Sequence, residues 1–371
     1  HIMNNAGGAF LDAGLVKEVV PLKKDYFTAV QSSVKMDATQ THYNFVCGKV
    51  DLSLTFTSPL LLNDLDLLAR PVSYITYKVR SNDKKKHQVD ILLSASSDIA
   101  VNTPAQEVVS EKYNTRELLT LKAGTTEQPV LKKKGDDIRI DWGYMYVAAP
   151  NAPGFEQYIS SEEPTDAFLT GRTNGVSFNS IKGKSLYLNT LVSIPNTGNT
   201  PVERFVMLAY DDIKSIQYFG NDLDPWWKSA TNHKIEEQIK RASQEHASLI
   251  ERCNDFDKLL FRDASAAGGD NYAKLCVLAY RQAAAAHKLV RSPQGDTLFL
   301  SKENLSNGCI NTVDVTYPSA PMFLIYNPQL LKGMLNGIFY YSESGKWNKP
   351  FAAHDLGTYP IANGQTYNED M

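Results

Sequence analysis

The pattern of apolar and polar positions changes near residue 222. Between about residues 40 and 220, apolar and polar residues alternate along several short runs, which is typical of strands with one buried face. The clearest alternating runs are residues 50–57, 75–80 and 137–142, and further apolar runs occupy 89–93, 186–194 and 205–210. Turn-rich stretches separate these runs, and no helical period lies between them. The pattern therefore predicts a largely antiparallel β-sandwich.

After Gly220 the apolar residues recur with the period of a helix. They follow one another at steps of four and three: Ile235, Ile239, Ala242, His246, Leu249, Cys253, Phe256 and Leu260. This stripe predicts a helix of about 30 residues that Gly268-Gly269 interrupts. A second, alanine-rich helix is expected over residues 271–289 and a third over 328–342, which together predict packed helical hairpins. His246 lies on the apolar stripe, so we expect it in the core or at an interface.

These patterns divide the chain into three parts. Residues 1–20 are expected to be an N-terminal tag and irregular segment, residues 21–222 a β-sandwich domain, and residues 223–371 a helical domain. No signal peptide is recognisable, and His1-Ile2-Met3 resembles a cloning remnant, so we expect that any export signal has been removed.

Composition and charge narrow the classes of partner. The chain has 371 residues with 38 Lys and Arg against 41 Asp and Glu, a net charge of −3. This balance argues against a nucleic-acid partner or an anionic membrane, and no stretch approaches the ~20 apolar residues of a membrane span. The four cysteines are widely spaced and are expected to be free thiols. No HExxH or EF-hand pattern is present, so we expect no metal and no cofactor.

Two loop-like segments, residues 306–319 and 347–360, concentrate the side chains that carry chemistry. Asp314, His354 and Asp355 are suited to proton transfer, which makes them the candidate catalytic residues. A second set is suited to binding a small polar substrate by hydrogen bonds or ring stacking: Asn307, Asn311, Tyr317, Trp347 and Tyr359. The alternative is that these polar side chains bond to their own loop backbone, as in Asx turns.

The mechanism stays open at this point. Ser306, Thr312 and Cys309 are conceivable nucleophiles, but no local signature favours one of them, and none is assigned. A pair of carboxylates also suits glycoside hydrolysis, in which one donates a proton and the other activates water or attacks.

Three segments of the chain resemble the glutaminase A family: residues 51–79, 306–335 and 350–367. The resemblance runs from about residue 36 to 371. It implies an N-terminal β-sandwich followed by an (α/α)6 toroid of six helical hairpins, and hydrolysis of L-glutamine to L-glutamate and ammonia. Because family members are commonly exported, it also implies an extracellular or periplasmic location.

Only about three helices can be counted, so the sequence predicts an incomplete toroid and a partial chain. Uncovered helix faces would favour self-association, or association with the missing C-terminal part of the chain. Two alternatives to the glutaminase hypothesis remain: a glycoside hydrolase-like enzyme that acts on sugars on the same scaffold, and a non-catalytic binding fragment.

Overall fold

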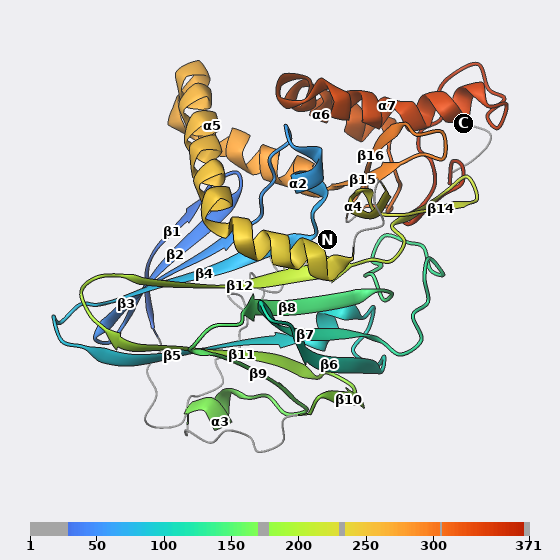
Figure 1. Cartoon of the computed structure of the whole chain (residues 1–371). Helices are drawn as coiled ribbons and strands as arrows, with labels where there is room; N and C mark the ends of the chain where they lie inside the picture. Colours follow the sequence, from blue (N-terminus) through green and yellow to red (C-terminus); the bar gives the residue numbers. More distant parts are fainter. Residues whose placement is uncertain (1–28, 170–177, 230–233, 305, 367–371) are drawn as a thin grey trace.

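A computed structural model of the protein describes residues 29–169, 178–229, 234–304 and 306–366. Within these ranges a β-rich part is followed by a mainly helical part, which confirms the fold class expected from the change of period (Figure 1). The expected N-terminal segment, residues 1–20, lies outside the described residues.

The β-rich part is built on one large sheet. Its strands lie in the order β1-β2-β3-β4-β12-β8-β7-β6-β10, and every neighbouring pair is antiparallel. In chain order the strands are β1 (Val30–Met36), β2 (Gln40–Cys47), β3 (Val50–Thr57), β4 (Val72–Ser81), β6 (Val108–Asn114), β7 (Leu118–Thr125), β8 (Tyr144–Pro150), β10 (Ser180–Gly183) and β12 (Val202–Asp211). Short helical turns lie in the connections: α2 (Leu65–Ala69), η1 (Ser97–Ala100) and α3 (Thr165–Leu169).

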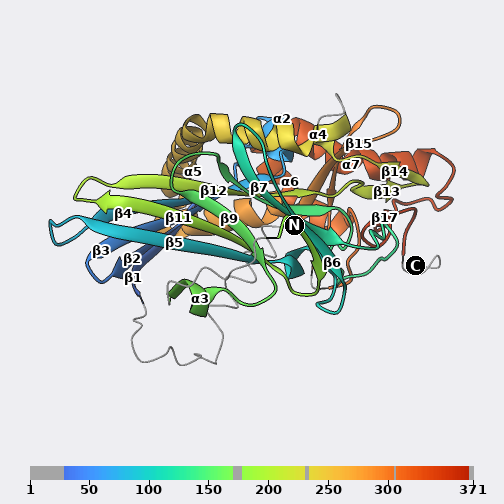
Figure 2. The same ribbon diagram turned by 60° about the horizontal axis from the view of Figure 1, so that its bottom comes forward.

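A second, smaller sheet covers one face of the large sheet (Figure 2). It consists of β5 (His87–Ser96), β11 (Tyr187–Thr197) and β9 (Phe155–Ser160), in the order β5-β11-β9. Apolar side chains of both sheets meet between them, with Ile75 and Val147 from the large sheet packed in one core with Leu188 and Val192 of β11. Burial of each such side chain contributes about 1.5–3 kcal/mol. The predicted β-sandwich is therefore present.

One predicted strand is wrong. Residues 137–142 form an irregular segment, although Ile140 and Trp142 are buried as the alternation suggested. The Trp142 indole Nε1 donates to the backbone oxygens of Asp212 at 2.8 Å and Lys214 at 2.9 Å. A loop packed against the end of β12 therefore buries these side chains without pairing to a neighbouring strand.

The first limb of α5 (Ile235–Ala285) covers the other face of the large sheet (Figure 1). Ile239, Ala242 and Leu249 are buried there with Tyr74 and Met207 of the sheet, so the predicted stripe is the buried face of the helix. The Tyr74 hydroxyl donates to the backbone oxygen of Ala242 at 3.0 Å, which fixes the helix on the sheet.

His246 lies at this interface, as the sequence predicted. Its ring stacks on Phe205 with 3.8 Å between ring centroids, and its Nε2 lies 3.2 Å from Thr76 Oγ1. Burial lowers the pKa of His246, so the ring packs as a neutral group.

Gly269 interrupts α5, as the Gly268-Gly269 pair predicted. Its φ of 81° and ψ of 176° are not helical, and the second limb turns back toward the hairpin that follows (Figure 1). That limb ends at Ala285, earlier than the predicted residue 289. The chain then continues as β15 (His287–Arg291), which pairs antiparallel with β16 (Thr297–Ser301).

Two helices follow the hairpin. α7 (Pro328–Glu343) matches the predicted third helix, whereas α6 (Val313–Tyr326) was expected to be a loop. α6 contains Pro318 and Pro321, which supply no backbone N–H. The Ser319 hydroxyl lies 3.0 Å from the carbonyl oxygens of both Val315 and Thr316. It therefore donates a hydrogen bond to backbone acceptors of the proline-containing helix.

The chain after α7 returns to the end of the sandwich. There β17 (Ile361–Ala362) pairs parallel with β13 (Ile216–Tyr218), which pairs antiparallel with β14 (Asn221–Leu223), and the short α4 (Trp226–Ser229) follows. This return places the last described loop against both parts of the molecule. None of the helices in the described ranges combines the length and apolar character needed to cross a bilayer.

Candidate functional site

The two polar segments singled out by the sequence lie side by side. Backbone hydrogen bonds join Ile310 N to Gly357 O at 2.7 Å, Leu356 N to Ile310 O at 2.9 Å, and Val313 N to His354 O at 2.9 Å. This short ladder aligns residues 308–313 with residues 354–359. Asp314 directly follows residues 308–313 and is therefore placed beside His354.

Asp314, His354 and Asp355 form an acid–histidine cluster. The His354 Nδ1 lies 2.9 Å from Asp355 Oδ2, and its Nε2 lies 3.7 Å from Asp314 Oδ1. The side chains of Asp314 and His354 are 72% and 45% exposed, whereas that of Asp355 is fully buried. The cluster therefore has a buried anchor and an open side that a soluble substrate can reach.

Asp355 holds the cluster in place through several hydrogen bonds. Its Oδ1 accepts the backbone N–H of Gly357 at 2.8 Å and that of Thr366 at 3.1 Å. Because an ionised carboxylate can only accept, the His354 Nδ1 carries the proton of that contact. In the neutral ring, Nε2 then has a free lone pair that faces Asp314, so it is placed to act as a base.

Asp314 sits in the first turn of α6, where its negative charge interacts favourably with the positive end of the helix dipole. The residue before the helix, Thr312, donates its hydroxyl to Glu303 Oε2 at 3.2 Å. Glu303 is a further carboxylate beside the cluster that the sequence analysis missed. The only signal for it was its position between an apolar run that ends at Ser301 and the polar segment that begins at residue 306.

The three conceivable nucleophiles remain unassigned, and one of them is disfavoured by its surroundings. Cys309 is fully buried, and burial raises the pKa of its thiol to about 12, with the nearby charges of Asp355 and Glu303 adding to the effect. The thiol is therefore protonated at neutral pH and is a poor nucleophile.

The structure corrects the expectation that Trp347 and Tyr359 stack on a ligand. Both rings are buried in the core that surrounds the last loop. The Trp347 indole Nε1 donates to the backbone oxygen of Phe351 at 2.5 Å. The Lys302 ammonium lies 5.1 Å from the centre of the Tyr359 ring. These two aromatic residues therefore stabilise the loop.

Both asparagines bond to backbone groups, but only Asn307 bonds to its own loop, as the alternative interpretation proposed, because the partner of Asn311 lies in α7. The Asn311 amide is buried and donates to the backbone oxygen of Met334 at 2.8 Å, and Asn307 Oδ1 accepts the N–H of Cys309 at 2.8 Å. Tyr317, by contrast, is 83% exposed on α6. Of the predicted binding residues, Tyr317 is exposed and Asn307 is half-buried, whereas Asn311, Trp347 and Tyr359 are buried.

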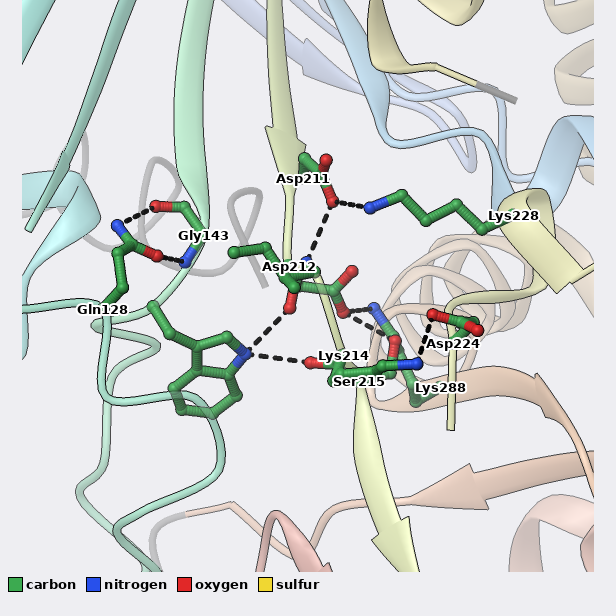
Figure 3. A network of polar contacts seen from close by, with 11 residues as sticks. Gln128, Gly143, Asp211, Asp212, Lys214, Ser215, Asp224, Lys228 and Lys288 are labelled. Atoms are coloured by element: carbon green, nitrogen blue, oxygen red, sulfur yellow. Dashed lines mark hydrogen bonds and ion pairs between the residues drawn. The ribbon is translucent and has the colours of Figure 1, made fainter. Parts of the chain in front are cut away.

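A polar network connects the sandwich to the part that carries the cluster (Figure 3). Asp212, just after β12, accepts from Lys288 Nζ at 2.5 Å and from Ser215 Oγ at 2.7 Å, and Asp211 accepts from Lys228 Nζ at 2.6 Å. Burial alone would raise the pKa of Asp212, but Lys288 and the hydrogen bonds lower it, so this buried carboxylate is ionised.

A loop of the sandwich also contacts the candidate site directly. The backbone N–H of Gly135 donates to Tyr359 O at 3.0 Å, and Lys302 Nζ donates to Asp136 O at 2.7 Å. Gly308, with φ of 71°, packs so closely on Asp136 that an added Cβ would lie 2.7 Å from its Cα. The sandwich therefore supports the loop ladder that positions the cluster.

Within the described residues, no group of three or more His, Cys, Asp or Glu side chains is arranged to hold a metal ion. All four cysteines are free thiols, as the sequence predicted.

Two family models match the chain. A domain of unknown function, DUF5127, matches residues 39–263, and the glutaminase A six helical-hairpin domain matches residues 269–371. The second model covers both segments of the loop ladder, together with α6 and α7. The boundary between the two models falls near the kink of α5, not at the start of the helical part.

Two curated relatives are similar along most of the chain. Glutaminase A of Aspergillus oryzae (strain ATCC 42149 / RIB 40) is 27% identical over 362 residues, which cover 92% of this chain and 51% of the relative. A protein named "Probable glutaminase" from Arthroderma benhamiae (strain ATCC MYA-4681 / CBS 112371) is 24% identical, with 91% of this chain and 42% of the relative covered. The chain thus spans about half the length of the curated relatives it matches.

Among solved structures, a putative kojibiose phosphorylase from the human microbiome is similar with a TM-score of 0.35 and 10% identity. The match covers 67% of this chain and 27% of that one. A similarity at this level supports no argument about chemistry.

Proposed function

Because the chain belongs to the glutaminase A family, we propose that the whole protein hydrolyses the side-chain amide of L-glutamine to L-glutamate and ammonia. The observation that carries the proposal is the acid–histidine cluster of Asp314, His354 and Asp355. It lies inside the region matched by the glutaminase A six helical-hairpin domain, and its open side faces solvent.

In this proposal His354 is the general base. Asp355 holds the Nδ1–H side of the ring, so that Nε2 accepts a proton from a water molecule that Asp314 helps to orient. The water oxygen attacks the amide carbon, and the C–N bond then breaks. His354 returns the proton to the leaving nitrogen, so the products are the carboxylic acid and ammonia. General acid–base catalysis of this kind contributes about 10²–10⁴-fold to a rate.

The test is the release of ammonia from L-glutamine by the whole protein. We expect Asp355→Asn and His354→Gln to lower kcat by about 10²-fold or more, because each removes the oriented base. Asp255→Asn is a matched control, since this carboxylate is 72% exposed on α5 and forms only a long pair with Lys258 at 3.7 Å. The control should leave kcat unchanged.

A folded whole protein that releases no ammonia from L-glutamine would contradict the proposal. A parallel screen with oligosaccharides tests the alternative enzyme class. Release of reducing sugar without release of ammonia would replace the glutaminase proposal by a carbohydrate-active one.

A further inference from the structure

A cavity of about 60 Å³ lies beside the β15–β16 hairpin. Two lysines and three apolar or aromatic residues form much of its lining: Lys288, Lys302, Ile216, Leu300 and Tyr359. Asn304 also lines the cavity and is exposed, so the cavity reaches the surface there. Its volume is about four times what one water molecule needs. The cavity therefore has room for a small ligand with a charged and an apolar part.

The register of the hairpin places both lysines on one face. Lys288 lies directly opposite Leu300, and Lys302 follows Leu300 by two residues, so the three side chains share a face of the two strands. This is the face that packs on the core around the last loop, because Leu300 is buried there with Ile216 and Tyr359. The lysines and the other lining residues therefore belong to the same side of the hairpin.

The charge of Lys288 is already compensated. Its ammonium pairs with the carboxylate of Asp212 at 2.5 Å (Figure 3). The pKa of Asp212 is lowered by this lysine and by hydrogen bonds, so the carboxylate is ionised. The pair is neutral as a whole, while the ammonium still has N–H groups for a further acceptor, since it carries three donors.

Lys302 differs from Lys288 because its charge is not paired. The residue is 8% exposed, and among the residues that the structure describes no ion pair joins its ammonium to a carboxylate. The ammonium donates to the backbone oxygen of Asp136 at 2.7 Å and lies 5.1 Å from the centre of the Tyr359 ring. A buried lysine is seldom left without a counter-charge.

The pKa of Lys302 reflects this incomplete compensation. Burial lowers it, and the more distant charges of Asp136 and Asp137 oppose the effect only in part. One neutral carbonyl oxygen and one ring therefore do not replace the water that this ammonium loses, and an anion beside it would.

We propose that this cavity binds a short-chain carboxylate such as acetate, with its oxygens directed at the ammonium groups of Lys302 and Lys288 and its carbon atoms at Leu300 and Ile216. The single negative charge balances the one unpaired lysine. The four non-hydrogen atoms of acetate suit the volume. This inference goes beyond the proposed function, because binding at this site requires no hydrolysis.

The test compares sodium acetate with two matched compounds. Acetamide has the same size and shape but no charge, and sodium chloride at equal ionic strength supplies an anion without carboxylate oxygens. We expect acetate to shift the NMR signals of the Tyr359 ring in the chain studied here until the site is saturated. Acetamide and chloride should leave these signals unchanged.

A variant and a control test the assignment to the lysine. Lys302→Met should weaken acetate binding by about tenfold or more, because it removes the unpaired charge and its hydrogen bond to the ligand. Lys258→Met changes a lysine that is 77% exposed on α5 and should leave the affinity for acetate unchanged. If Lys302→Met does not fold, a crystal structure of the unaltered chain grown with acetate provides a test without a variant. Acetate within hydrogen-bond distance of Lys302 Nζ would support the proposal.

Three results would overturn the proposal. These are equal acetate affinity in the unaltered chain and in folded Lys302→Met, an equal response to chloride, and a cavity that holds water only in crystals grown with acetate. A protein that binds acetate but releases no ammonia from L-glutamine would retain this site and lose the proposed function, so the two failures are distinguishable.

Discussion

Asp212 and Lys288 form a 2.5 Å ion pair that joins the end of strand β12 to strand β15. The Asp212 side chain is 5% exposed, while that of Lys288 is 29% exposed. Their positions are 76 residues apart in the sequence. The pair therefore links the sandwich to the part of the chain that carries the acid–histidine cluster (Figure 3).

Removal of the lysine should destabilise the protein more than removal of the pair. Lys288→Met leaves a buried carboxylate without its cation, and we expect it to lower the free energy of unfolding by about 2–4 kcal/mol. The double variant Asp212→Asn with Lys288→Met should recover part of this loss, because no uncompensated charge remains. Urea unfolding of both variants measures the difference, and equal destabilisation would contradict it.

The same pair predicts a loss of stability in acid. The pKa of Asp212 is lower in the folded state than the value of 3.8 expected in the unfolded chain. The ionised carboxylate therefore contributes to the free energy of unfolding above pH 3.8, and this contribution is lost as the pH falls through the pKa of the folded state. Lys288→Met should remove this contribution and shift acid unfolding to higher pH. Lys258→Met, which changes an exposed lysine on α5, is the matched control.

His287 predicts a second pH effect at a higher pH. Burial lowers its pKa from 6.5 to about 4, so the unfolded chain binds a proton between these values that the folded chain does not. Stability should therefore fall as the pH decreases from about 6.5 to about 4, by at most about 3 kcal/mol. Thermal unfolding of His287→Phe across this range should show a smaller dependence on pH. An unchanged dependence would contradict the assignment.

The close contact between Gly308 and the sandwich predicts that an alanine at this position destabilises the protein more than an alanine at a glycine without such a contact. Gly308→Ala would place a Cβ 2.7 Å from Asp136 Cα and would also strain a backbone with φ of 71°. Gly220→Ala is the matched control, since its φ is 82° but no atom lies within 4 Å of the added Cβ. We expect Gly220→Ala to lower the free energy of unfolding by about 1 kcal/mol, and Gly308→Ala to lower it by about 2 kcal/mol more. Similar urea midpoints for the two variants would show that the contact carries little energy.

The elements that the sequence predicted well are those with a regular period. The stripe from Ile235 to Leu249 packs on the large sheet, and the stripe continues to Leu260, which is buried with the second limb of α5. Its spacing alone therefore identified the helix and its buried side. The alternation at Ile140 and Trp142 failed as a strand signal because burial of alternate side chains does not require a paired backbone. Here the Trp142 indole bonds to two carbonyl oxygens beyond the end of β12.

The site could be predicted only in part for a similar reason. His354 and Asp355 are adjacent in the sequence, so their proximity was evident. Asp314 is brought to them only by the backbone hydrogen bonds between the two segments. Such long-range pairing cannot be recognised from a single sequence. α6 was missed because Pro318 and Pro321 are strong helix breakers, and the helix is held by its packing. Trp347 and Tyr359 were misjudged because composition cannot distinguish an aromatic ring in a pocket from one in a core.

The outer face of α6 predicts self-association of this chain. Tyr317, Leu324 and Ile325 are 83%, 57% and 76% exposed, and all three lie on α6. Exposed apolar surface of this kind favours association, so we expect light scattering to show species larger than a monomer that grow with concentration. Leu324→Glu with Ile325→Glu should shift the chain toward the monomer, because two charges would have to be buried at the contact.

A matched control separates this face from apolar exposure in general. Val46 is 40% exposed and lies in β2, a strand of the large sheet of the sandwich. Val46→Glu should leave the association unchanged if the α6 face is responsible. A stable monomer of the unaltered chain at all concentrations would contradict the prediction. A monomer produced equally by Val46→Glu would place the contact on the sandwich, because only there would that substitution introduce a charge into the interface.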